Sequence, residues 1–184
     1  QAKGEATLNI TKNLTGNRAE GIGENEFSFT VTLLDEDGNE TGTSQTVQIP
    51  AAEEGTPYTS KGTVTFNYNQ ENLNKDGSEK TYWYKISENA SAAVSVAKDT
   101  ADYYAKVVLS NSGKGDGKIV SAVTYHTAIG EEALKAEDGT LLTGVTFTNS
   151  YTADGKGKIS GNKKLTGNRN NKENDIKDQE FQFQ

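Results

Sequence analysis

Apolar and polar side chains alternate along many short stretches of this chain, which is the pattern of β-strands with one buried face. Polar turns rich in Gly, Asn and Asp separate these stretches, and no long amphipathic helical pattern interrupts them. The predicted strands are residues 6–14, 26–34, 45–49, 62–68, 81–88, 103–109, 119–126 and 141–151. Residues 89–99 fit a weak strand or a loop, and residues 128–138 fit a helical turn or a loop. The pattern therefore predicts an all-β, immunoglobulin-like β-sandwich of about eight or nine strands.

Three of the predicted strands place a polar side chain on the face that should be buried. Lys12 shares its side of the first strand with Leu8 and Ile10. Glu88 continues the tyrosine and isoleucine positions of the strand at 81–88, and Asn149 continues the valine and phenylalanine positions of the last strand. A buried ammonium group must be paired, neutralised or chemically consumed. We therefore expect the three side chains to form a polar cluster in the core.

The opening of the chain is repeated near its end. The heptapeptide KNLTGNR at 12–18 returns as KKLTGNR at 163–169, and EFSF at 26–29 returns as EFQF at 180–183. The offsets are 163 − 12 = 151 and 180 − 26 = 154 residues, so the repeat period is about one domain.

This repeat predicts the domain organisation. We expect one complete domain at 1–152, a linker at 153–157, and the first two strands of an incomplete second copy at 158–184. Two strands cannot fold alone. Residues 158–184 therefore either begin the next domain of a longer tandem protein or donate strands to a neighbouring molecule.

Four sequence blocks resemble those of a known family. They are L-x-I-x-K-x-L-x-G at 8–16, E-F-x-F at 26–29, Y-x-Y-K-I-x-E at 82–88 and V-x-F-x-N-x-Y at 145–151. Taken together, they resemble the isopeptide-forming, immunoglobulin-like domains of Gram-positive surface proteins, in particular the FctA-like major pilins and their "pilin isopeptide linkage" relatives. The resemblance covers residues 6–151, and the second copy carries the first two blocks alone.

The resemblance implies a crosslink. It identifies Lys12 as the attacking amine, Asn149 as the carboxamide that is attacked, and Glu88 as the acid that promotes the reaction. Lys163 matches the crosslinking lysine of the next repeat, whose glutamate and asparagine would lie beyond residue 184. Burial would lower the pKa of the Lys12 amine and favour its neutral, nucleophilic form. A protonated Glu88 could donate to the Asn149 carbonyl oxygen and pass a proton to the leaving ammonia.

Each of these residues also has a simpler structural explanation, in which it takes no part in a reaction. Lys12 could extend its ammonium to water from a sheet edge, Glu88 could be exposed at the end of its strand, and Asn149 could cap a turn.

The only histidine, His126, has no Cys or second His as a metal partner, and the carboxylates at 35–37 lack the spacing of a calcium loop. We therefore expect no metal and no cofactor.

Composition argues against several classes of protein, including nucleic-acid-binding, disulfide-bonded and membrane-spanning ones. The net charge of −7 argues against nucleic-acid binding, the absence of Cys excludes disulfides, and no apolar run approaches the ~18 residues that span a membrane. The sequence favours a structural module of a pilus or repetitive stalk at the bacterial cell surface, with neighbouring copies or repeats as partners. A self-crosslinking reaction happens once, so we do not expect an enzyme. The alternative is an adhesin domain that binds a host protein or glycan through a pocket or an aromatic-lined groove; a hydrolase is a distant third.

Overall fold

The computed structural model describes residues 2–55, 57–91, 93, 95–155, 158, 160, 161 and 164. The chain divides into a compact first unit, Gln1–Ala153, and a second unit, Asp154–Gln184. All nine strands in the described residues belong to the first unit, and they form two sheets without an α-helix. The predicted all-β sandwich is therefore confirmed. Lys163 and nearly all of the predicted second copy lie outside the described residues.

The two sheets differ in size and contain both neighbouring and distant segments of the chain. In spatial order, the four-stranded sheet contains β4 (Tyr58–Asn69), β1 (Lys3–Gly16), β9 (Val145–Tyr151) and β6 (Val96–Ala97). The five-stranded sheet contains β3 (Glu40–Gln48), β2 (Ser28–Leu34), β5 (Lys80–Glu88), β7 (Asp102–Asn111) and β8 (Ile119–His126). A short 3₁₀ turn, η1 (Gln70–Asn72), follows β4.

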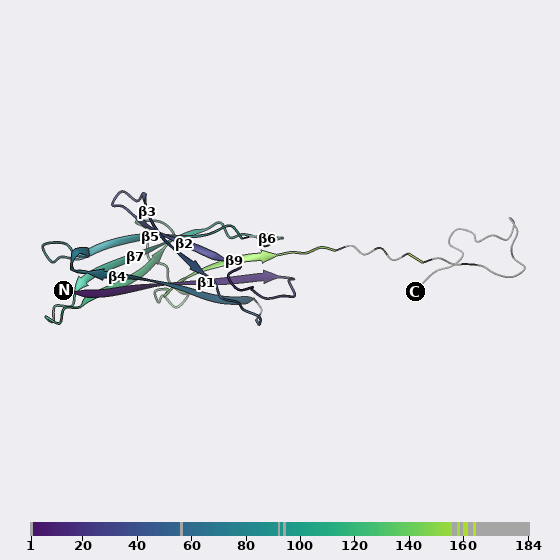
Figure 1. Ribbon diagram of the computed structural model, residues 1–184, viewed down its shortest axis with the longest axis horizontal. Coiled ribbons are helices and arrows are strands. Elements are labelled where there is room, and N and C mark those ends of the chain that lie inside the picture. The colour runs from purple at the N-terminus through teal and green to yellow at the C-terminus, as the bar shows by residue number, and fades with distance from the viewer. Residues whose placement is uncertain are drawn as a thin grey trace, which may run out of the picture. The chain divides into compact units, whose positions relative to one another are not determined.

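The first and last strands of the domain lie side by side (Figure 1). β1 and β9 are parallel, whereas each of the other strand pairs is antiparallel. Parallel neighbours require a long connection, and here it is the whole domain between them. The pairing of β1 with β9 therefore brings together side chains from opposite ends of the sequence.

The core lies between the sheets and follows the period-two pattern. On β1, Leu8, Ile10 and Leu14 are buried, whereas the threonines and asparagines between them face outward. Phe29 of one sheet packs on Phe147 of the other, with ring centroids 4.7 Å apart. Aromatic side chains supply large buried apolar area, so a chain with few aliphatic residues can still fill this interior.

Some predicted strand boundaries were wrong, and the structure decided the two stretches for which the sequence left alternatives open. β3 begins at Glu40, not at residue 45, and nearly all of its side chains are exposed, so no alternation marked its start. Only Val96–Ala97 of the weak stretch at 89–99 is a strand. The stretch at 128–138 contains turns but no helix, and a backbone hydrogen bond from Ala136 N to Thr140 O closes a small hairpin there.

Candidate functional site

Lys12, Glu88 and Asn149 meet in the interior between the sheets. Lys12 lies toward the end of β1, Asn149 lies on the adjacent β9, and Glu88 ends β5 in the opposite sheet. Their exposed fractions are 0%, 4% and 0%. Lys12 is in register with Phe147, and Asn149 is in register with Leu14, so the lysine and the asparagine are diagonal neighbours on parallel strands. The structure thus brings together all three side chains singled out by the alternation.

A single carboxylate contacts both the amine and the carboxamide. The Lys12 Nζ donates a hydrogen bond of 2.9 Å to Glu88 Oε2. The Asn149 Nδ2 donates a hydrogen bond of 2.7 Å to the other oxygen, Glu88 Oε1. Because Glu88 comes from the opposite sheet, it can reach both strands at once. The carboxylate is therefore placed to move a proton between the two nitrogen atoms.

The carbonyl oxygen of Asn149 has a different partner from the one that the sequence suggested. Asn149 Oδ1 accepts a hydrogen bond of 2.7 Å from the backbone N–H of Asp99. The hypothesis that Glu88 donates to this oxygen does not agree with the observed contacts, because both Glu88 oxygens face nitrogen donors. Asp99 carried no signal in the sequence, since it lies in an irregular segment after β6 and acts here through its backbone.

Apolar side chains and one carboxylate influence the pKa of the lysine. The ring of Phe27 lies 4.8 Å from Lys12 Nζ, and Phe147 and Tyr103 pack together nearby with ring centroids 5.0 Å apart. Burial lowers the pKa of Lys12 below its ordinary value, and the hydrogen bond to Glu88 partly opposes that shift. The lowered pKa favours the neutral amine, which is the form that can attack a carbonyl carbon.

The remaining candidate residues have structural partners. His126 is buried, with Nδ1 2.8 Å from the Glu131 carbonyl oxygen and Nε2 2.8 Å from Thr124 Oγ1, and its ring packs edge-on against Trp83. Asp35 accepts hydrogen bonds from backbone N–H groups of its own turn. In the described part of the chain, no group of three or more His, Cys, Asp or Glu residues is arranged to hold a metal ion.

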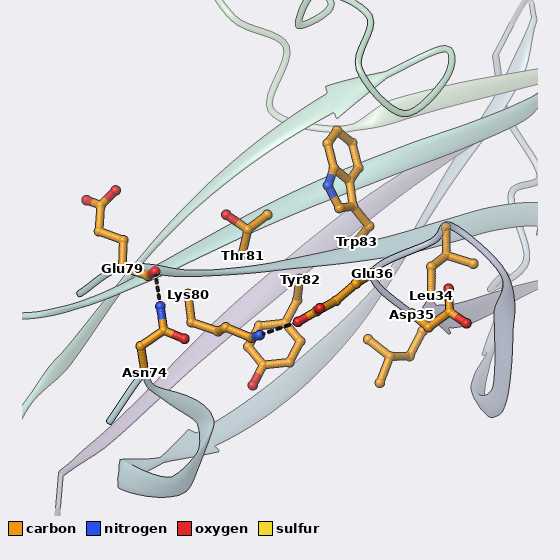
Figure 2. A pocket seen from close by; sticks show the side chains of 10 residues that line it. Leu34, Asp35, Glu36, Asn74, Glu79, Lys80, Thr81, Tyr82 and Trp83 are labelled. Carbon is orange, nitrogen blue, oxygen red and sulfur yellow. Dashed lines mark hydrogen bonds and ion pairs between the residues drawn. The ribbon is translucent and has the colours of Figure 1, made fainter. Parts of the chain in front are cut away.

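A surface pocket of about 430 Å³ lies where the turn after β2 meets the start of β5. Its lining includes Tyr82 and Trp83, but Figure 2 shows the two rings pointing to opposite sides of their strand. An ion pair of 3.0 Å between Lys80 and Glu36 crosses the same region. The rings therefore form no shared platform for stacking a sugar. The ligand-binding alternative stays a prediction, which a glycan array would test.

A family model matches the domain that holds this site. The model of the Spy0128-like isopeptide containing domain, FctA, matches residues 8–152. The chain belongs to this family. The match spans all three clustered side chains and all nine strands except the beginning of β1. A comparison with curated protein sequences found no match.

Solved structures of pilins are similar to this FctA-family chain. The major pilin from Streptococcus pyogenes is 21% identical, with 79% of this chain and 50% of that chain covered and a TM-score of 0.39. The T-13 major pilin from Streptococcus pyogenes serotype GAS131465 is 17% identical, with coverages of 82% and 55% and a TM-score of 0.45. The chain thus spans about half the length of these pilins. Within the described residues, no helix is both long and apolar enough to cross a membrane.

Proposed function

We propose that Lys12 and Asn149 join in an intramolecular isopeptide bond that Glu88 promotes, and that the crosslinked domain is a structural unit of a bacterial surface fibre. The observation that supports the bond is a buried amine and a buried carboxamide held by opposite oxygens of one carboxylate. Membership of an isopeptide-containing domain family supports the same reaction.

The contacts define a reaction route from the amine and the carboxamide to an amide and free ammonia, in which every proton is accounted for. Glu88 Oε2 first takes a proton from the Lys12 ammonium, because an apolar interior favours a neutral amine and acid over two charges. The amine lone pair then forms a bond to Asn149 Cγ, while the carbonyl π electrons move to Oδ1. The Glu88 carboxyl gives the proton it took from Lys12 to Nδ2, which faces Oε1, and its Oε2 then takes a second proton from the attacking nitrogen. As the carbonyl re-forms, the Cγ–Nδ2 bond breaks and ammonia leaves.

The fold supplies the remaining acceleration. Both reactants are held on adjacent strands, so an intermolecular reaction becomes an intramolecular one at high effective molarity. The product replaces a buried lysine with a neutral amide and removes the cost of holding that charge in the core. Because the reaction consumes its own lysine, it occurs once per molecule. The domain is therefore a self-processing structural protein and not an enzyme with turnover.

The position of the bond suits a domain under tension. Force that enters at Lys3 and leaves at Tyr151 shears β1 against the parallel β9. A covalent link between the two strands would carry that force instead of the hydrogen bonds of the sheet. The 149 − 12 = 137 residues that the bond encloses would then stay folded. Such protection is useful in an extracellular pilus or stalk that resists flow.

Assembly with neighbouring copies is part of the same proposal. The solved pilins that the chain resembles are major pilins by name, and the repeated blocks at 158–184 predict either a following domain or strands donated to a neighbour. In either case Lys163 would be the crosslinking lysine of the second copy. Light scattering of residues 1–155 beside the full chain tests strand donation, which requires self-association that disappears when 158–184 is removed.

Intact-mass spectrometry tests the bond directly. Formation of one isopeptide bond releases ammonia and lowers the mass by about 17 Da relative to the sequence. Fragmentation of a protease digest should then find the peptides of Lys12 and Asn149 joined. Glu88→Ala should restore the full mass. An unchanged mass in the folded wild-type protein rejects the crosslink.

A further inference from the structure

Asp99 contacts the site through both its backbone and its side chain. Its N–H donates to Asn149 Oδ1 at 2.7 Å, and its Oδ2 accepts from the N–H of Thr148, the preceding residue on β9, at 2.9 Å. Its second oxygen, Oδ1, accepts from the N–H of Ala101 at 3.0 Å and so closes the turn in which Asp99 lies. The carboxylate thereby fixes the backbone N–H against the carboxamide.

These contacts lie on a strand edge that has little other pairing. β6 pairs with β9 only at Ser150 and Tyr151, so the edge of β9 beside Asn149 is covered by the segment at 98–101 instead of by a strand. A side chain that accepts from two backbone N–H groups holds such a segment in one place. The order of this short segment therefore depends on Asp99.

The backbone N–H meets the atom that becomes negatively charged in the proposed reaction. When the amine attacks Cγ, the π electron pair of the carbonyl moves to Oδ1. A fixed N–H donor directed at that oxygen stabilises the developing charge more than it stabilises the starting amide. Glu88 cannot supply this donor, because its oxygens are occupied by Lys12 Nζ and Asn149 Nδ2.

We propose that Asp99 completes the crosslinking site: its backbone N–H is the oxyanion donor to Asn149, and its carboxylate is the device that positions this donor on β9. The inference rests on the proposed isopeptide reaction. It also implies an order of events, since the carboxamide is fully activated only after the 98–101 segment has docked on β9. Crosslinking then follows folding of the last strand and does not trap an incomplete sheet.

Three full-chain variants separate the two roles. Asp99→Ala removes the carboxylate and keeps the N–H, Asp99→Pro removes both, and Thr100→Ala changes an exposed neighbouring side chain while leaving the Asp99 carboxylate and N–H in place. Crosslinking is followed by isotope pulse–chase in expressing cells, with the intact mass of the labelled protein read over time. Circular dichroism establishes that each variant folds.

The expected order of rates follows from the contacts. Loss of two hydrogen bonds from the carboxylate should slow Asp99→Ala by about tenfold. Loss of the oxyanion donor should slow Asp99→Pro by at least about 100-fold relative to wild type. Thr100→Ala should react at nearly the wild-type rate. A merely structural role for Asp99 would slow the alanine and proline variants equally, and that outcome overturns the assignment of the N–H.

Further measurements separate the positioning role of Asp99 from a failure of folding or of the crosslinking reaction itself. If Asp99→Pro does not fold, the comparison passes to Asp99→Ala and Asp99→Asn, because asparagine keeps one acceptor and should recover part of the rate. Reaction of Asp99→Ala at the wild-type rate overturns the positioning role. Failure of the underlying reaction looks different: the wild-type protein itself would then keep its full mass.

Discussion

Replacing Lys12 by methionine should isolate the contribution of the covalent bond to stability. Lys12 is fully buried, and methionine is an unbranched apolar side chain of similar length that fills irregular space in a core. The variant loses the amine, so no isopeptide bond can form, yet it leaves neither a large cavity nor an unpaired ammonium. Glu88 keeps its hydrogen bond from Asn149 Nδ2. Beyond the about 1–3 kcal/mol that the unpaired Glu88 Oε2 costs, the loss of stability must then come from the missing crosslink.

The size of the loss follows from the loop that the bond closes. The proposed bond would join residues 149 − 12 = 137 apart, and a crosslink of that span lowers the entropy of the unfolded chain by the equivalent of about 5 kcal/mol at 25 °C. For a domain of this size, each kcal/mol shifts the midpoint of thermal unfolding by about 2–4 °C. Lys12→Met should therefore unfold about 10–20 °C below wild type.

Scanning calorimetry measures the shift, with the intact mass of every sample measured alongside it. Lys61→Met is the matched control, because Lys61 lies on the exposed face of β4 and its replacement should leave both the crosslink and the midpoint unchanged. The reasoning is refuted if wild type is crosslinked but Lys12→Met unfolds within a few degrees of it.

Three other predictions follow from the same geometry. Stretched in a single-molecule instrument, Lys12→Met should release about 45–49 nm more contour length than wild type, which is the extended length of the 137 enclosed residues; equal lengths would mean that the crosslink carries no load. In Asn149→Ala, burial keeps the pKa of the Lys12 amine below 10.5, so the unfolded chain binds more protons between that lowered pKa and 10.5. The free energy of unfolding of Asn149→Ala, measured by urea titration, should therefore rise with pH through this window. The Lys12→Met/Asn149→Ala double variant, which lacks the amine, should show no such rise. Gly16→Ala should lower the stability by about 1–3 kcal/mol in urea titrations, because Gly16 has φ +107° and an added Cβ would meet the Tyr151 carbonyl oxygen; an unchanged midpoint would contradict this.

Local patterns predicted the parts of the fold that depend on neighbouring residues. Side chains of a strand alternate whatever the strand pairs with, so the buried positions of Lys12, Glu88 and Asn149 could be predicted before their contacts were known. β3 was partly missed for the same reason: it is an edge strand with exposed polar side chains on both faces, and it has no alternation to detect. The helical turn considered at 128–138 did not form.

The contacts within the site could not be predicted from these local patterns. Alternation placed three polar side chains inward but could not state that Glu88 would contact both nitrogen atoms across the sandwich. The resemblance to a family suggested which residues react. Chemical reasoning suggested Glu88 as the hydrogen-bond donor to the Asn149 carbonyl oxygen, and the observed donor differs. That donor is the backbone N–H of Asp99, and every residue except proline carries such a group.

The sequence by itself determined the strand pattern, the inward direction of Lys12, Glu88 and Asn149, and the repetition of the first two sequence blocks. These features arise from the two-residue period of an extended backbone and from composition, and both can be read locally. Only the tertiary structure decided that β1 and β9 are parallel neighbours and that one carboxylate and one backbone N–H converge on Asn149. Those contacts join residues 50 to 135 positions apart in the chain, and their distances depend on how the two sheets pack.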